Sequence, residues 1–225
     1  MTRPFRALLL TSCLWALPAK GAEADLQSWS LFIAQGNASP RLRWYAEVQP
    51  RVGGDIQRVE RLLLRPAVGF QVNSVVSLWL GYAWTPLVSP EFQDEHRPFQ
   101  QLLMERPLGS AITLINRTRF EQRAIAGTGG ISLRFRHMGR VLVQPLENSP
   151  FRIALYNEVF VTLNDVDRGP PSGFDQNRAF AGVNLKTGPV LQVELGYMNN
   201  PVRRRAPAET RLNHNVTLMV LANVP

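Results

Sequence analysis

Residues 75–86 read Val-Val-Ser-Leu-Trp-Leu-Gly-Tyr-Ala-Trp-Thr-Pro, and this stretch decides the fold. Its bulky apolar side chains fall at every second position, and small or hydroxyl side chains fill most positions between them. The apolar set is Val76, Leu78, Leu80, Tyr82 and Trp84; the alternate set is Ser77, Gly81, Ala83 and Thr85, together with Trp79. Side chains of a β-strand point alternately to the two faces of a sheet, whereas a helix repeats every 3.6 residues. The stretch therefore predicts a strand with one strongly apolar face.

The same period of two continues along most of the chain, with turn-forming clusters such as Gly53-Gly54-Asp55 between the runs. The predicted strands are 26–36, 41–52, 58–71, 75–86, 97–106, 111–124, 130–141, 151–164, 175–186, 189–199 and 211–221. Tight connections near 72–74 and 187–188 contrast with long ones at 87–96, 165–174 and 200–210. This pattern predicts a closed antiparallel up-and-down β-barrel of 10–12 strands. Within that range 12 is favoured, because bacterial single-chain barrels almost always have an even number.

The N-terminus has the features of an export signal. Arg3 and Arg6 precede an apolar run, residues 7–17, which is too short to span a bilayer as a helix. Ala22-Glu23-Ala24 supplies a small-x-small cleavage site. We therefore predict a signal peptide over residues 1–24 and a single barrel domain over residues 25–225. Cys13 is the only cysteine, so cleavage after Ala24 would leave no thiol or disulfide.

Alternation alone does not say which face of a barrel points outward. A soluble, exported lipocalin-like binding barrel would turn its apolar face inward, whereas a transmembrane barrel turns it toward lipid. Export, the lack of disulfides and bulky aromatic residues on the apolar face favour the membrane. These aromatic residues, several of them toward strand ends, are Trp29, Trp44, Tyr82, Trp84 and Tyr197. The expected location is the bacterial outer membrane. The expected partners are outer-membrane lipid and lipopolysaccharide, the barrel-assembly machinery and periplasmic chaperones, and no nucleic acid.

Several fragments together resemble an uncharacterised bacterial family, domain of unknown function 2490. They are Leu64-Arg65-Pro66-Ala67-Val68-Gly69-Phe70, Leu78-Trp79-Leu80-Gly81-Tyr82, Asn116-Arg117-Thr118-Arg119-Phe120-Glu121-Gln122-Arg123, Tyr156-Asn157-Glu158-Val159-Phe160 and Leu195-Gly196-Tyr197, with Asp175-Gln176-Asn177-Arg178 and Asn213-His214 in their expected order. The resemblance runs from about Trp29 to Leu221, and Glu95-His96-Arg97 departs from the Glu-Asn-Arg that is more usual in that family. It implies an outer-membrane-barrel-like fold and carries no established activity.

Charged residues gather on the face that a membrane barrel would turn inward. Arg117, Arg119, Glu121 and Arg123 occupy alternate positions of one predicted strand. Further inward candidates on other strands are Arg65, Arg134, Arg136, Glu158, Arg178 and Glu194. After residue 24 a single lysine, Lys186, stands against 21 arginines. Two interpretations remain open, because arginine pairs carboxylates well in buried places and also selects anions in pores. The lumen is either a paired polar core, which is structural, or a surface that binds or passes a small anionic solute.

Catalytic, metal and cofactor chemistry have weak support. The histidines are His96, His137 and His214, and no Gly-x-Ser-x-Gly elbow or serine–histidine spacing accompanies them. No His-x-His or His-x-x-x-His pair suggests a metal, and no glycine-rich phosphate loop precedes a helix. We therefore expect no enzyme, no catalytic residues, no metal and no cofactor. The alternative is an outer-membrane lipid-modifying enzyme that uses His214. The run Arg203-Arg204-Arg205 is expected either to contact lipopolysaccharide or to be solvated.

Overall fold

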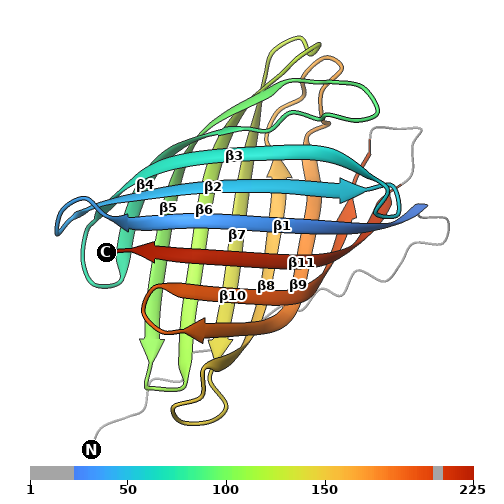
Figure 1. Cartoon of the computed structure of the whole chain (residues 1–225). Helices are drawn as coiled ribbons and strands as arrows, with labels where there is room; N and C mark the ends of the chain where they lie inside the picture. Colours follow the sequence, from blue (N-terminus) through green and yellow to red (C-terminus); the bar gives the residue numbers. More distant parts are fainter. Residues whose placement is uncertain (1–22, 205–209) are drawn as a thin grey trace, which may run out of the picture.

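The computed structural model describes residues 23–204 and 210–225, and these residues form one closed β-barrel (Figure 1). The strands are β1 (Glu23–Asn37), β2 (Leu42–Gly53), β3 (Arg58–Gln71), β4 (Val76–Trp84), β5 (Glu95–Leu108), β6 (Ile112–Ile125), β7 (Ile131–Val143), β8 (Phe151–Thr162), β9 (Gly173–Thr187), β10 (Leu191–Val202) and β11 (Arg211–Val224). Each predicted segment corresponds to one of them, so the prediction of a barrel with 10–12 strands is confirmed. Among the described residues, no helix is long and apolar enough to cross a membrane.

The barrel closes through a parallel pair, β1 with β11, whereas every other neighbouring pair is antiparallel. An odd number of up-and-down strands requires this, because the first and last strands then run in the same direction. The eleven strands lie within the predicted range of 10–12. The favoured even number, 12, is not found among the described residues. Glu23 and Val224 consequently lie at opposite ends of the barrel.

The two ends of the barrel differ in their connections. One end, which we call the short-turn end, carries residues 38–41, 72–75, 109–111, 144–150 and 188–190 and the end of β11. The other, the long-loop end, carries the short connections 54–57 and 126–130, the long ones 85–94 and 163–172 and the connection from β10 to β11, and β1 begins there at Glu23. The predicted cleavage after Ala24 would remove the first two residues of β1. Residues 1–22 lie outside the described part, so the signal peptide stays a prediction.

The face that points outward is the apolar one. Large hydrophobic side chains are exposed on all eleven strands, for example Phe32 on β1, Leu80 on β4 and Leu195 on β10. The inward face instead buries charged and amide side chains together with a few aromatic ones. Trp29 is one of these, so its expected place on the outward face is wrong: its indole lines the lumen and donates to the buried Gln27. A water-soluble barrel has the reverse arrangement, because exposed apolar surface is unfavourable in water. The fold is therefore of the outer-membrane type.

Gly81 on β4 leaves room for an inward-facing ring on the next strand. A Cβ at this position would lie 2.2 Å from Cζ of Phe99, which is itself buried. Because Arg119 lies over the same ring at 4.1 Å, the ring has little space to move. We expect Gly81→Ala to lower the free energy of unfolding by about 1–3 kcal/mol, as overpacking does. The measurement is the urea midpoint of the refolded barrel in detergent.

Gly139→Ala on β7 is the matched control for this substitution. A Cβ there would meet its nearest atom, the Oδ1 of Asn116, only at 3.8 Å. Alanine is also better than glycine inside a strand for reasons of backbone entropy. Equal urea midpoints for the two variants would contradict the packing argument at Gly81.

Candidate anion-binding lumen

The four alternating charged residues of β6 all project into the barrel. Arg119, Glu121 and Arg123 are buried, and Arg117 is half-buried nearer the short-turn end. β6 can place them so because successive side chains of a strand alternate between lumen and exterior. The remaining sequence candidates on β3, β7, β8, β9 and β10 also face the lumen: Arg65, Arg134, Arg136, Glu158, Arg178 and Glu194.

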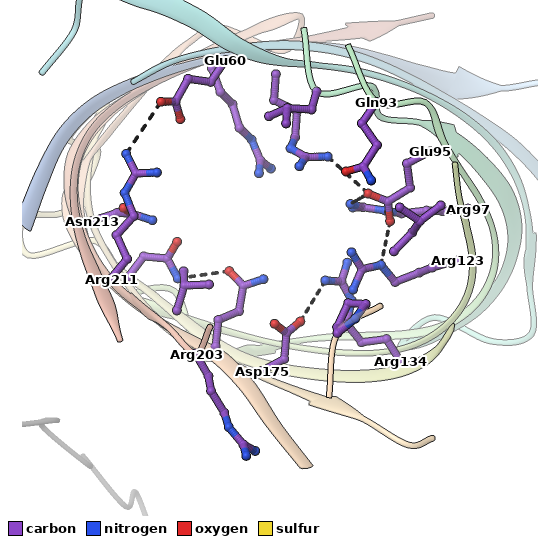
Figure 2. Close-up of a pocket in the computed structure, with 18 of the residues that line it drawn as sticks. Glu60, Gln93, Glu95, Arg97, Arg123, Arg134, Asp175, Arg203, Arg211 and Asn213 are labelled. Atoms are coloured by element: carbon purple, nitrogen blue, oxygen red, sulfur yellow. Dashed lines mark hydrogen bonds and ion pairs between the residues drawn. The ribbon is translucent and has the colours of Figure 1, made fainter. Parts of the chain in front are cut away.

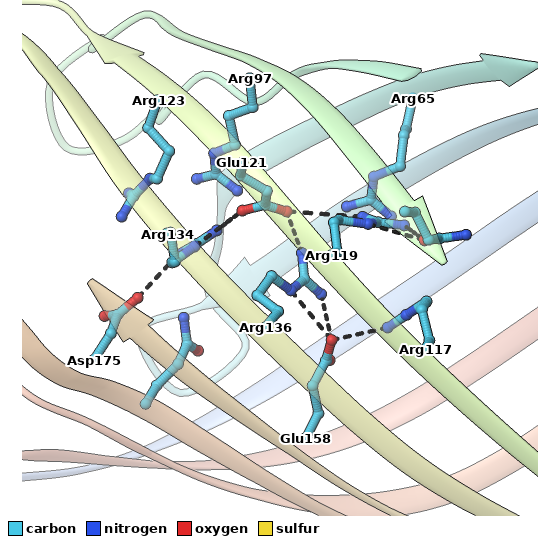
Figure 3. A network of polar contacts seen from close by, with 12 residues as sticks. Arg65, Arg97, Arg117, Arg119, Glu121, Arg123, Arg134, Arg136, Glu158 and Asp175 are labelled. Atoms are coloured by element: carbon cyan, nitrogen blue, oxygen red, sulfur yellow. Dashed lines mark hydrogen bonds and ion pairs between the residues drawn. The ribbon is translucent and has the colours of Figure 1, made fainter. Parts of the chain in front are cut away.

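Glu121 is the centre of the first ion-pair group (Figure 3). Only 2 % of this residue is exposed. Arg134 approaches one carboxylate oxygen with two nitrogens, at 2.6 and 2.9 Å, and Arg136 donates to the other oxygen at 2.5 Å. Arg119 stands farther off, at 3.8 Å, and gives its strong hydrogen bonds to the amide oxygen of Gln101. Arg134 thus makes two charge-assisted hydrogen bonds to the single oxygen Oε2.

Glu158 on β8 is the centre of a second group. Its Oε1 accepts hydrogen bonds from Arg136 at 2.8 Å and from Arg117 at 2.9 Å. Arg178 approaches the other oxygen only to 3.8 Å. Arg136 therefore joins the two groups, which together extend over the inward faces of the neighbouring strands β6 to β9 (Figure 3). The two buried carboxylates, Glu121 and Glu158, thus pair with most of the arginines in these two groups.

Other pairs extend this network toward the barrel wall. Arg65 donates to Glu47 at 2.7 Å, and the hydroxyl of Tyr45 donates to the same carboxylate. Arg140 pairs with Glu194 across the short-turn half of the lumen. Glu47 and Arg140 were not among the sequence candidates. Residues 41–52 were predicted as a strand, but nothing in the sequence identified Arg65 as the partner of Glu47.

A layer of buried side chains separates the lumen into two cavities. We call it the central layer; it consists of Phe99, Met138, Phe160, Arg119, Glu121 and Glu158, all buried. Phe160 has no exposed surface, and the guanidinium groups of Arg134, Arg136 and Arg178 lie 4.4–5.3 Å from its ring centre. The cavities on the two sides share no lining residue.

The cavity at the long-loop end, which we call the outer cavity, has a volume of about 480 Å³. Figure 2 shows its side chains arranged as a ring around an open centre. Its arginines are Arg51, Arg61, Arg65, Arg97, Arg123, Arg134, Arg136, Arg168, Arg178, Arg203 and Arg211, and its carboxylates are Glu60, Glu95 and Asp175. Arginines therefore outnumber carboxylates in the described lining, and some of these arginines pair with carboxylates just outside it, as Arg65 does with Glu47 and Arg211 with Asp25.

The carboxylates of the outer cavity hold the arginines nearest to them. Glu95 binds Arg97 at 2.6 Å, Arg123 at 2.7 Å and Arg61 at 3.2 Å. Asp175 binds Arg134 at 3.0 Å. The residues Glu95 and Arg97 flank His96, so the segment that departs from the family pattern places its two charged residues inside and its histidine outside.

The cavity at the short-turn end, the inner cavity, is smaller, at about 260 Å³. Its lining mixes aromatic and aliphatic side chains with Arg117, Arg119, Arg140 and Arg152. Arg152 donates to the amide oxygens of Asn184 and Gln192. Both cavities are therefore basic, and the outer one is the larger and the more strongly charged.

All three histidines lie on the outer surface of the barrel and contact a hydroxyl group of a neighbouring strand. His96 bonds Tyr82, His137 bonds Thr118, and His214 bonds Tyr197. None of these contacts, in the part of the chain that the structure describes, brings a serine to a histidine. No group of three histidine, cysteine or acidic side chains there is arranged to hold a metal ion.

Asp94, in the loop before β5, binds the ring of His96 from the other side. The indole N–H of Trp84 donates to this carboxylate, and this hydrogen bond, with that of His96, holds the pKa of Asp94 below its ordinary value. The carboxylate is therefore charged at neutral pH and fixes the ring of His96 at the barrel rim.

The run Arg203-Arg204-Arg205 lies in the connection from β10 to β11. Arg203 donates to the carbonyl oxygen of Ser172, and Arg204 pairs with Glu23 at 2.7 Å. Arg205 lies outside the described residues. The contact of Arg203 lies within the long-loop end, whereas that of Arg204 would be lost on the predicted cleavage after Ala24.

An apolar exterior, a charged lumen and a closed ring of strands define this protein as an outer-membrane-type β-barrel. The sequence matches the model of the family described as protein of unknown function DUF2490 over residues 26–211, and the chain belongs to that family. This confirms the resemblance found in its motifs. An uncharacterized protein of Methylorubrum extorquens is 34 % identical over 224 residues, which are 97 % of each chain. Among solved structures, LpxR from Salmonella typhimurium is similar with a TM-score of 0.46 and 6 % identity, over 80 % of this chain and 83 % of that one.

Proposed function

We propose that this protein is a non-enzymatic barrel of the bacterial outer membrane that captures small anionic solutes in its outer cavity. Bacterial barrels have short periplasmic turns and longer extracellular loops. By this rule the long-loop end faces the outside of the cell, and the outer cavity opens there. The apolar exterior on all eleven strands supports the membrane location over a soluble, lipocalin-like barrel.

The excess of arginine in the outer cavity is the observation that carries the proposal. Eleven arginines and three carboxylates line it, counted over the described residues. A network that only filled the lumen would be expected to balance its charges, because an unpaired buried charge is strongly unfavourable. Nine of the eleven arginines lie within 4.0 Å of a carboxylate, several of them of a carboxylate outside the lining, whereas Arg51 and Arg203 have no carboxylate that close among the described residues. A cavity walled by one sign of charge also raises the local concentration of ions of the opposite sign.

The same geometry supports binding rather than steady passage. Phe160 and its neighbours in the central layer stand between the two cavities. An ion crossing the lumen would have to displace this layer or its ion pairs. Catalysis has less support, because the histidines face outward and lack a serine partner among the described residues. Arginines at the rim, such as Arg204, suit contact with the phosphates of lipopolysaccharide.

Calorimetry and bilayer recording together test this function on the refolded wild-type protein. We expect inorganic pyrophosphate to bind the protein in detergent, with an affinity that falls as salt rises, because screening weakens exposed electrostatic attraction. We expect no channel events when the same preparation is inserted in planar bilayers. Steady conductance would show an open pore, and the absence of pyrophosphate binding at low salt would refute anion capture.

A further inference from the structure

Two arginines of the outer cavity differ from the rest in how they are held. The guanidinium carbons of Arg51 on β2 and Arg178 on β9 lie 3.7 and 4.9 Å from the ring centre of Trp29 on β1. The indole N–H of Trp29 donates to Gln27 at 2.9 Å, and Gln27 donates to Asp25. Trp29 is therefore fixed, and it holds two cations against one ring.

Neither cation has a carboxylate of its own among the described residues. Arg51 donates through Nε and Nη2 to the neutral amide oxygen of Gln49, at 3.2 and 2.8 Å. Arg178 approaches Glu158 only to 3.8 Å, and that carboxylate already accepts from Arg136 and Arg117. The Nε of Arg178 is buried and has no hydrogen-bond partner there.

Neutral amides, rather than acids, complete the surroundings of this pair. Gln27, Gln176 and Asn200 line the same part of the outer cavity, and Asn200 donates to Gln176 at 3.1 Å. Arg134, by contrast, is bound by two carboxylates, those of Glu121 and Asp175. A structural pair would be expected to have acids in these positions, since partly buried like charges repel one another.

We propose that Arg51 and Arg178, held on Trp29, form the binding site for a phosphoryl-type oxyanion in the outer cavity. This inference rests on the proposed function and assigns it to two residues. An oxyanion would supply the missing negative charge and accept hydrogen bonds from the guanidinium edges. Stacking on the indole orients the guanidinium planes before the ligand arrives, which lowers the entropic cost of binding.

The ligand chemistry has two sources, a free phosphate compound and the phosphorylated headgroup of an outer-leaflet lipid. Inorganic pyrophosphate titrated into the protein in detergent represents the first source. Proteoliposomes containing lipopolysaccharide, with pyrophosphate displacement as the readout, represent the second. Displacement by lipopolysaccharide would indicate the headgroup, and its failure would indicate the free compound; the same two arginines are required in either case.

Arg51→Gln and Arg178→Gln test the site. We expect each to weaken pyrophosphate binding at least tenfold, roughly the loss of one charge-assisted contact. The control is Arg41→Gln, which changes an exposed arginine in the connection between β1 and β2 at the short-turn end, outside the lining of the outer cavity. This control should bind within about threefold of the wild type.

Thermal unfolding separates a ligand site from a structural pair. Because the two cations repel each other, the glutamine variants should melt within a few degrees of the wild type. A much lower melting temperature, or pyrophosphate binding equal to that of the wild type, would overturn this assignment and leave the proposed function standing. Failure of the wild type to bind any pyrophosphate would instead refute the proposed function itself.

Discussion

Glu121→Gln is expected to destabilise the barrel by about 3–5 kcal/mol, the cost of breaking a buried ion pair from one side. Glu121 lies in the central layer and accepts hydrogen bonds from Arg134 and Arg136 on β7. Glutamine keeps the shape but removes the charge, so two buried guanidinium groups lose their shared counterion. Arg134 retains Asp175, and Arg136 retains Glu158, which limits the loss. The measurement is the free energy of unfolding in urea, with the shift in gel mobility on heating as the sign of a folded barrel.

The matched control for this substitution is Glu91→Gln. Glu91 lies exposed in the loop between β4 and β5. The chemical change is the same, but the carboxylate is solvated, so we expect a change within about 0.5 kcal/mol. Equal stability of the two variants would mean that the arginines of the central layer do not depend on Glu121.

The strands could be predicted from the sequence because alternation is a local property. Residues 75–86 showed an apolar and a small face before any neighbour was known, and β4 has that form. The closure of the barrel could not be predicted in this way. It depends on β1 meeting β11 in parallel, across nearly the whole chain, and alternation is the same for a parallel and an antiparallel neighbour. The usual even count therefore favoured twelve strands.

The position of the charged residues was predictable, but their partners were not. Alternation put Arg119 and Glu121 on one face of β6, where the structure has them. Which carboxylate an arginine meets depends on the curvature of the barrel, since Arg140 on β7 reaches Glu194 on β10 across the lumen. Arg51 was not among the sequence candidates. It became a candidate because no carboxylate lies beside it among the described residues. That property depends on the three-dimensional packing and cannot be found in the sequence.

Phe160→Ala is expected to convert a silent barrel into an anion-selective pore. Phe160 has no exposed surface and lies between the outer and inner cavities, with three guanidinium groups around its ring. Removing the ring opens space at the level where the two cavities approach each other, and the arginines that remain favour anions. The truncation also costs roughly 3–5 kcal/mol of stability, so only protein with the mobility of the folded barrel should be used.

Recording in planar bilayers under a salt gradient measures this effect. The variant should show channel events whose reversal potential lies toward that of chloride, whereas the wild type should stay silent. Phe135→Ala on β7 is the control, since Phe135 points outward and its loss leaves the lumen unchanged. A folded Phe160→Ala barrel that stayed silent would mean that the ion pairs of Glu121 and Glu158 seal the lumen without the ring. The polar part of the central layer would then be the true barrier, and the outer cavity would remain a closed-ended anion site even without its aromatic floor.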